Sequence, residues 1–370
     1  MKFGIFYEMQ LPKPWGPASE LDIYQQSLDQ IELADELGYD YVWEVEHHFL
    51  EEYSHSSSPE VFLAAASQRT RNIRLGHGIA LLPAGYNHPA RTAERIATLD
   101  LVSNGRVDFG TGESSSEMEL GGFGVSREEK KAMWEESLRC IVGMFRDGPW
   151  EFKGQYIDFP KRNVIPKPVQ KPHPPLWVAC SNPNTVFTAA RAGLGALGFD
   201  FSGPEETGRR REEYYRIIRE ECEPIGDAIN AQFAIVSGFM CCPRDDDAIA
   251  RGVPGMRFFG FALSHYYAGT HVPGDTDIMR AFKSVTQAAP TEASGGCIGS
   301  PKTIRERLLA YEEAGVDQVI FIAQAGATKH EDIMSSLRLF ASELLPEFKE
   351  RDVAHQKRRE QWLSAPVPAP

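Results

Sequence analysis

Two hydrophobic patterns alternate along the chain. Short runs such as "KFGIFY" and "DQVIFI" are almost wholly apolar, as strands covered on both faces are. Longer runs carry apolar residues at helical spacing, and the one over residues 20–38 ends in Gly38, a common helix terminator. The alternation predicts repeated strand–helix units and therefore a parallel sheet.

Eight units can be counted in this way. Strands are expected over residues 2–7, 41–45, 72–82, 106–112, 174–181, 196–201, 231–242 and 317–323. Helices are expected over residues 20–38, 58–70, 88–103, 126–145, 182–193, 203–221, 300–315 and 329–350. Eight units fit an eightfold barrel, with a doubly wound sheet as the alternative. We therefore expect an α/β protein, a single (β/α)8 TIM barrel with inserted loops over residues 1–350, and a C-terminal tail over residues 351–370.

Two segments interrupt the alternation. Residues 146–175 are proline-rich and contain "FKGQYIDF", which could form a small hairpin. Residues 252–299 are rich in glycine, proline and aromatics with weak periodicity, which predicts a long irregular segment. The aromatics of that segment favour a lid over an apolar ligand rather than disorder. They are Phe258, Phe259, Phe261, Tyr266 and Tyr267.

Charge and composition exclude several classes of partner. The net charge of -13 argues against nucleic acid and against an anionic membrane surface, because both would repel the protein. No window approaches the roughly 20 apolar residues of a membrane span, and the first residues do not form a signal peptide. The six cysteines are scattered, as in reduced proteins. We expect a cytoplasmic protein.

The stretch "YVWEVEHHFLEEY" places two histidines and four glutamates at the end of an expected strand. Barrel enzymes carry their chemistry at such strand ends. Adjacent histidines on an extended chain point to opposite faces, so we expect no metal site. The stretch could then carry proton chemistry or form a solvated loop, and Glu51 and Glu52 fit the start of such a loop. His77 and His88 are weaker candidates.

Two turns after later strands could hold a phosphate. "GTGESS" and "CSNPNT" each combine small hydroxyl side chains with free backbone N–H groups. The alternative is that their glycines only make tight turns and their serine and asparagine only cap helices.

Several motifs in this order resemble one known family. They are "WEVEHHF", "IRLGHGIALLPAGYNHPARTAERIATLDLVSNGRVDFGTG" and "KPVQKPHPPLWVACS". The chain is similar to the bacterial luciferase-type, flavin-dependent monooxygenases over residues 2–200, and more faintly over residues 298–321. The resemblance implies the same barrel, with FMN lying across the strand ends.

The resemblance also implies roles for single residues. The catalytic histidine falls on His47 and its carboxylate on Glu46, and either Glu44 or Glu46 would orient the imidazole. His48 is expected to be a strand-end residue bonded to backbone. A non-proline cis peptide is expected between Gly78 and Ile79, beneath the flavin. Further cofactor-binding positions are Gly112, Glu113, Lys131, Cys180, Ser181, Asn182 and Thr185.

The sequence departs from luciferase at the loop after the fourth strand. Gly112 and Glu113 replace a cysteine and an arginine, so the reactive thiol is absent, one phosphate-binding cation is lost, and light emission is not expected. Lys131 lines up with another phosphate-side arginine and could supply charge.

We expect a two-component monooxygenase. It would take reduced FMN from a separate flavin reductase and use O2 to oxygenate a small apolar compound: a carbonyl compound, a hydrocarbon or a terpenoid. His47 would act as a general base or hydrogen-bond donor near neutral pH. The alternatives are an F420-dependent hydride-transferring oxidoreductase and a flavin-binding protein without turnover. Small and apolar residues in the helices over 58–70 and 88–103 lead us to expect a homodimer, with ordinary packing of these helices on the barrel as the alternative.

Overall fold

The computed structural model describes residues 1–199, 203–268, 274, 276–285 and 296–364. Eight parallel strands close into a barrel, which confirms the expected fold class. In order around the barrel they are β1 (Lys2–Tyr7), β2 (Tyr41–Glu44), β3 (Arg74–His77), β5 (Val107–Gly112), β8 (Leu176–Cys180), β9 (Gly195–Phe199), β10 (Phe233–Cys241) and β12 (Gln318–Ile322). The ring closes at β1, where Gly4 is in register with Tyr41 on one side and Ile320 on the other.

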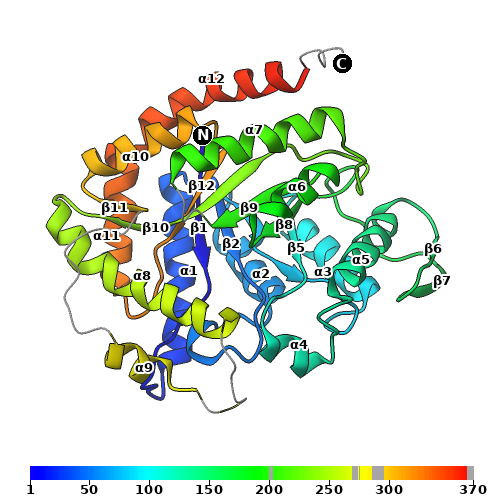
Figure 1. Ribbon diagram of the computed structural model, residues 1–370, viewed down its shortest axis with the longest axis horizontal. Coiled ribbons are helices and arrows are strands. Elements are labelled where there is room, and N and C mark those ends of the chain that lie inside the picture. The colour runs from blue at the N-terminus through cyan, green and yellow to red at the C-terminus, as the bar shows by residue number, and fades with distance from the viewer. Residues whose placement is uncertain (200–202, 269–273, 275, 286–295, 365–370) are drawn as a thin grey trace.

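Helices follow the strands around the outside of the barrel (Figure 1). They are α1 (Ser19–Leu37), α2 (Pro59–Arg69), α3 (Pro89–Val102), α5 (Lys130–Phe145), α6 (Pro183–Arg191), α7 (Pro204–Glu220), α10 (Pro301–Glu313), α11 (His330–Glu343) and α12 (Leu345–Ser364). Five of these ranges begin with proline, which lacks the N–H that a first helical turn leaves unpaired. Ser58 precedes α2, and its side chain makes no capping hydrogen bond.

The interior of the barrel is filled by large side chains. The rings of Trp43 and Trp177 lie 5.3 Å apart, and both side chains are fully buried. Glycine makes room for them: a Cβ added at Gly76 would lie 2.2 Å from the Trp43 ring, and one at Gly195 would lie 2.3 Å from the Trp177 ring. Because the interior is a packed core, a ligand site must lie at one end of the barrel.

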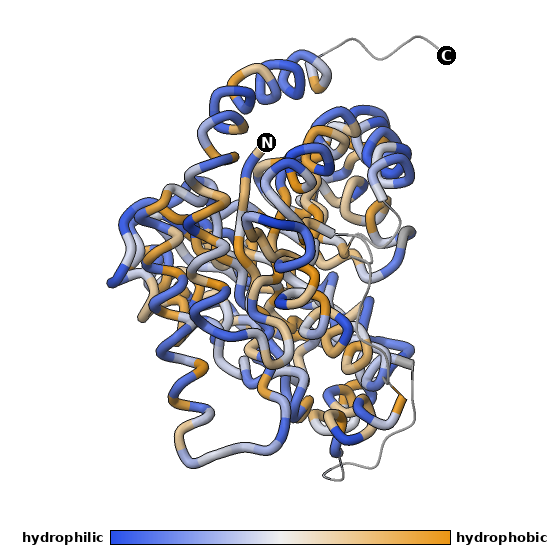
Figure 2. The backbone as a smooth tube through the Cα atoms, turned by 90° about the vertical axis from the view of Figure 1, so that its left-hand side faces the viewer, coloured by the Kyte–Doolittle hydropathy of each residue, from blue (hydrophilic) through white to orange (hydrophobic). Residues whose placement is uncertain are grey.

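The two ends of the barrel are covered differently. At the end where the strands begin, the Met1 amine forms a 2.5 Å ion pair with Asp352 of α12, a mostly hydrophilic helix (Figure 2). At the end where the strands finish, here called the mouth, lie α4 (Glu117–Phe123), α8 (Asp245–Ala268) and α9 (Ile278–Val285) (Figure 1). In the part of the chain that the structure describes, no helix is long and apolar enough to cross a membrane.

The expected hairpin is confirmed, outside the barrel. β6 (Trp150–Lys153) pairs antiparallel with β7 (Asp158–Arg162), so that Lys153 faces Asp158. Two further short strands extend the main sheet: β4 (Ala80–Leu81) pairs with β5, and β11 (Cys297–Gly299) pairs with β10.

The expectation of a long irregular segment over residues 252–299 was wrong in its first part. Residues 245–268 form α8 in spite of Pro254 and three glycines. Phe258, Phe259, Ala262 and Tyr266 are all buried, at a spacing that puts them on one helical face. Packing of that face outweighs the poor helix propensity of the sequence. Residues 269–273, 275 and 286–295 of the segment lie outside the described residues.

The last expected helix, over residues 329–350, is two helices in the structure. α11 ends at Glu343, and α12 begins at Leu345 and continues to Ser364. Pro346 explains the break, because in a continuous helix its nitrogen could not donate to the Ser342 carbonyl and its ring would clash with that carbonyl. The expected boundary at residue 350 therefore falls inside α12.

Candidate active site

The mouth of the barrel brings together titratable side chains from four segments. Glu8 directly follows β1, and His47 follows β2. Tyr53 ends a short 3-10 helix, η1 (Glu51–Tyr53), and Glu119 lies on α4. Parallel strands end at the same edge of a barrel, so groups distant in sequence meet there.

The His47 imidazole lies between two carboxylates. Its Nδ1 is 2.9 Å from Glu119 Oε1, and its Nε2 is 3.4 Å from Glu8 Oε2. Both carboxylates are buried, and only 12% of the His47 side chain is exposed. This imidazole therefore has an acidic partner on each nitrogen.

The surroundings favour the protonated imidazole. Burial alone would lower the pKa of His47, but the charges of Glu119 and Glu8, with the Glu119 hydrogen bond, raise it from 6.5 to about 9. This shift favours the imidazolium form of His47 at neutral pH. The expected role as a general base would need the neutral ring, so the geometry favours a proton or hydrogen-bond donor.

His48 has different partners from His47. Its Nε2 lies 3.2 Å from Glu46 Oε1, and its ring packs edge-on against Phe123 at 4.9 Å. Glu46 also accepts hydrogen bonds from the Leu81 N–H and from Asn87. The expected pairing of Glu46 with His47 is thus replaced by a pairing with His48, while Glu119 and Glu8 hold His47.

The other glutamates of the stretch are structural. Ser56 Oγ donates to Glu44 Oε1 at 2.5 Å, and burial raises the pKa of Glu44 well above its ordinary value. Glu52 is fully buried and accepts hydrogen bonds from the backbone N–H groups of Lys13, Ile278 and Met279. The expectation that Glu52 starts a solvated loop was wrong, because its carboxylate caps α9. Glu51 pairs with Lys13 at 2.7 Å.

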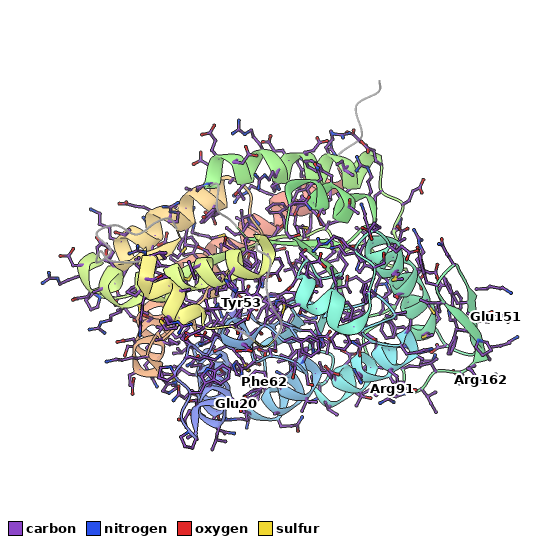
Figure 3. The ribbon with its side chains drawn as sticks, turned by 60° about the horizontal axis from the view of Figure 1, so that its bottom comes forward. Glu20, Tyr53, Phe62, Arg91, Glu151 and Arg162 are labelled. Carbon is purple, nitrogen blue, oxygen red and sulfur yellow. The ribbon has the colours of Figure 1, made fainter. Side chains whose placement is uncertain are left out.

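Aromatic side chains of α8 cover the mouth. Tyr53 lies next to α8 (Figure 3), with its ring 5.8 Å from Phe259 and 6.2 Å from Tyr266. Phe259 also lies 5.8 Å from Phe199, at the end of β9. The aromatics of the expected lid thus form a roof over the strand ends.

An apolar cavity of about 40 Å³ lies below this roof. It is lined by Phe6, Trp43, Gly78, Ala179, Leu197, Gly198, Phe199, Val236 and Ile320. Gly78 and Gly198 present backbone where other residues would present side chains. The site therefore combines an apolar floor with a charged rim.

Gly78 reaches this cavity, but its peptide bond to Ile79 is trans. The cis bonds of the described residues all precede proline, at Pro14, Pro166 and Pro172. The Gly78 N–H donates to the Glu44 carbonyl, and the Ile79 carbonyl accepts from the Glu46 N–H. These bonds hold an extended trans chain, which avoids the roughly 3–4 kcal/mol cost of a non-proline cis bond. The expected cis peptide was wrong.

The expected phosphate-side residues are spread over three places. Gly112 ends β5 against Ile79, where an added Cβ would lie 2.3 Å from the Ile79 side chain. Glu113 lies 3.4 Å from the Nζ atom of the largely buried Lys130, whereas Lys131 is exposed on α5. The structure therefore turns Lys130, not Lys131, toward the loop after β5.

The residues after β8 surround the first turn of α6. Cys180 is buried, and burial raises the pKa of its thiol to about 12. Ser181 and Asn182 are exposed, and the Asn182 side chain accepts from the Thr185 N–H at 3.2 Å. Asn182 therefore caps a helix, which was the alternative to a phosphate site. The Ser181 and Asn182 side chains are nevertheless exposed to solvent.

A second, polar cavity of about 20 Å³ lies between the barrel wall, α2 and α3. His77 lines it and is buried with both ring nitrogens unpaired. His88 is the N-cap of α3 and accepts from the Ala90 N–H. Among the described residues, no group of three or more His, Cys, Asp or Glu side chains could hold a metal ion.

Strained backbone is concentrated at this site. Four described non-glycine residues have positive φ, and three of them adjoin the His47 cluster: Met9 at 51°, Phe49 at 66° and Ser114 at 62°. Met9 follows Glu8, Phe49 follows His48, and Ser114 Oγ donates to Glu119 at 2.5 Å. Such conformations persist where the surrounding structure enforces them, often at functional sites.

Sequence reasoning missed Glu8, Tyr53, Ser114 and Glu119. Glu8 carried a signal, because a glutamate directly after the first apolar strand is at a strand end. Glu119 carried a weaker signal. It is the glutamate of "SEMEL" that lies between two apolar residues. Nothing in the sequence specified that α4 would point Glu119 at His47.

Comparisons with known proteins find relatives that match most of the chain. The model of the family described as luciferase-like monooxygenase matches residues 1–318. The oxygenase component of a flavin-dependent trigonelline monooxygenase from Acinetobacter baylyi is 25% identical, with 99% of each chain covered. The crystal structure of the monooxygenase RslO1 from Streptomyces bottropensis has a TM-score of 0.78 and is 28% identical, covering 94% of this chain and all of its own.

One neighbour shares the fold but uses a different cofactor. The coenzyme F420-dependent tetrahydromethanopterin reductase from Methanopyrus kandleri has a TM-score of 0.69 at 21% identity, with 94% of this chain and 99% of that chain covered. At this identity the likeness establishes the barrel alone.

Proposed function

Because the chain belongs to the luciferase-like monooxygenase family, we propose that it is the oxygenase component of a two-component system. It would accept reduced FMN from a separate flavin reductase and use O2 to oxygenate a small apolar carbonyl compound, hydrocarbon or terpenoid. The observation that carries the proposal is His47, a largely buried imidazole held between two carboxylates at the rim of an apolar mouth that aromatic side chains cover.

The residues at the mouth fit a flavin. The apolar floor and the glycine backbone at Gly78 and Gly198 suit a flat ring, and Lys130, Ser181 and Asn182 offer donors for a phosphate. The cavity of about 40 Å³ is a small part of the roughly 300–1,000 Å³ typical of ligand sites. Binding would therefore require the α8 aromatics to move from the mouth.

Reduced flavin supplies the electrons with which O2 is activated. The protein would keep water away from the flavin and would supply a proton from a donor at a fixed position. The α8 roof would limit the access of water to the mouth, and His47 presents Nδ1 to Glu119 and Nε2 to Glu8. A protonated donor at a fixed atom limits how many protons reach the site.

Two relatives favour oxygenation over F420-dependent hydride transfer. The trigonelline monooxygenase component and RslO1 are each more similar to this chain than the F420-dependent reductase is, by identity or by TM-score. The roof also suits a reaction that water would divert.

The test supplies each cofactor to the purified protein. Reduced FMN is expected to bind more tightly than oxidised FMN, and product from a panel of apolar ketones, alkanes and terpenoids should depend on O2 and on an added flavin reductase. Anaerobic reduction of F420 by substrate would contradict the proposal. So would tight retention of oxidised FMN together with direct NADPH oxidation.

A further inference from the structure

The two carboxylates that hold His47 are not equivalent. Glu119 is saturated with donors: Oε1 accepts from His47 Nδ1 and from the His48 N–H at 3.0 Å, and Oε2 accepts from Ser114 at 2.5 Å. These donors stabilise the ionised form. Glu119 is therefore a fixed anion.

Only one carboxylate oxygen of Glu8 accepts a hydrogen bond. Tyr53 OH donates to Oε1 at 2.9 Å, whereas Oε2 is buried with no hydrogen bond and lies 3.4 Å from His47 Nε2. An oxygen in this position has room for a proton, and the nearest proton is the one on Nε2. The contact is longer than a formed hydrogen bond and shortens when the proton is shared.

We propose that Glu8 is the proton-exchanging partner of His47, and that Glu119 fixes the imidazole so that the exchange takes place at one nitrogen. In the exchange the Nε2–H bond of His47 breaks and an O–H bond forms on Glu8 Oε2. The imidazolium–carboxylate pair then becomes a neutral imidazole beside a carboxylic acid, and no other group gains or loses a proton.

The charged groups around Glu8 support this assignment. Burial raises the pKa of Glu8 to about 7, against the lowering effects of the His47 charge and the Tyr53 hydrogen bond. Glu119 acts in the same direction as burial. Glu44 of β2 and Tyr267 of α8 also interact with Glu8, and burial raises the pKa of each well above its ordinary value. Glu8 is thus the acid of the cluster whose charge changes near neutrality.

The proposal deepens the proposed function, since it identifies the residue that would set the proton supply at the site. It also connects that supply to the roof. Tyr53 donates to Glu8 and contacts three aromatic residues of α8. Movement of α8 would displace the hydroxyl that stabilises ionised Glu8, and a Glu8 without that bond would take the proton more readily.

The experiment uses the full chain without flavin, so its outcome is independent of the monooxygenase proposal. Infrared spectroscopy monitors protonated carboxyl groups, and NMR monitors the His47 ring nitrogens, from pH 5 to 10. In the wild type we expect a carboxyl signal that titrates near pH 7 and an imidazolium that persists to about pH 9. Glu8→Gln should abolish that carboxyl titration, and the matched variant Glu119→Gln should retain one.

Tyr53→Phe provides a second variant in case Glu8→Gln does not fold. Loss of the hydroxyl should move the carboxyl midpoint to higher pH, because the hydrogen bond lowers the pKa of Glu8. The proposal is overturned if the neutral-pH carboxyl titration survives in Glu8→Gln, if Tyr53→Phe leaves its midpoint unchanged, or if His47 is neutral while Glu8 is ionised at pH 7 in the wild type. A wild type with this titration but no O2-dependent product would instead contradict the proposed function alone.

Discussion

At the scale of single residues, His47 and His48 form a natural pair of test positions. They are adjacent, but His47 contacts Glu8 and Glu119 whereas His48 contacts Glu46. His47→Ala should lower product formation by roughly 10²- to 10⁴-fold, as the loss of an acid–base group does, with reduced-FMN affinity within a few-fold. The lost product should reappear as hydrogen peroxide, because reduced flavin still reacts with O2.

His48→Ala is the matched control. Its ring packs on Phe123 and bonds to Glu46, so we expect lower stability with a product-to-peroxide ratio near that of the wild type. Product and peroxide are measured together under saturating substrate. Equal product yield from the wild type and His47→Ala would remove His47 from the mechanism.

The raised pKa of His47 also makes stability depend on pH. The pKa is 6.5 in ordinary surroundings and about 9 in the folded protein, so the folded state holds the proton over this interval and the unfolded state does not. The resulting stabilisation is fully present below pH 6.5 and is lost as pH rises through about 9. Between pH 6.5 and pH 9, the free energy of unfolding measured in urea should fall less for His47→Gln than for the wild type. An identical fall would contradict the assignment.

The sequence identified part of this site. The "EHHF" motif located His47, because a histidine after a barrel strand is placed by the fold itself. Glu119 and Glu8 could not be assigned to it, because their meeting depends on the path of the chain through Ser114 and on the direction in which α4 presents its side chains. Glu46 and His48 show the same limit, since the sequence led us to pair Glu46 with His47, whereas in the structure Glu46 pairs with His48.

At the scale of elements, Glu52 connects η1 to α9. Its buried carboxylate accepts from the backbone N–H groups of Ile278 and Met279. Glu52→Gln removes the charge and one acceptor, and it should lower the free energy of unfolding by about 1–3 kcal/mol. Hydrogen exchange should show faster exchange of the amides in α9.

Glu51→Gln is the control for this prediction. Glu51 is adjacent but partly exposed, and its ion pair with Lys13 is the kind that contributes about 0–1 kcal/mol. Comparable losses in the two variants would show that the buried cap has no special role.

Most elements followed from the hydrophobic pattern, and the exceptions have physical causes. The eight barrel strands are apolar runs because helices cover their outer faces. The sequence did not predict α8, because glycine and proline obscure its periodicity; tertiary packing, including the contacts of Phe259 with Tyr53 and Phe199, stabilises the helix. The division of α11 from α12 depended on Pro346, which was visible in the sequence.

At the scale of the whole molecule, α2 and α3 leave apolar side chains uncovered. Val61 is 67% exposed, and Leu101 and Val102 are each 43% exposed. These side chains support the expected homodimer, in which the two helices would pair with their copies. Sedimentation of the wild type at micromolar concentration should show a dimer, and Val61→Glu with Leu101→Glu should shift it to monomer.

Val353→Glu on α12 is the control, since Val353 is 61% exposed and lies near the opposite end of the chain. It should leave the sedimentation coefficient unchanged. A wild type that sediments only as a monomer would end the dimer proposal.

The positive φ values at Met9, Phe49 and Ser114 have a consequence for laboratory evolution. Each residue occupies a conformation that glycine or asparagine tolerates better, so selection for heat resistance should find replacements there readily. Each also adjoins a member of the His47 cluster, and Phe49 packs on Phe123 of the helix that carries Glu119. Variants with a higher melting temperature at these positions should form less product and more hydrogen peroxide per flavin oxidised. A gain in thermostability at these three positions would therefore lower productive turnover.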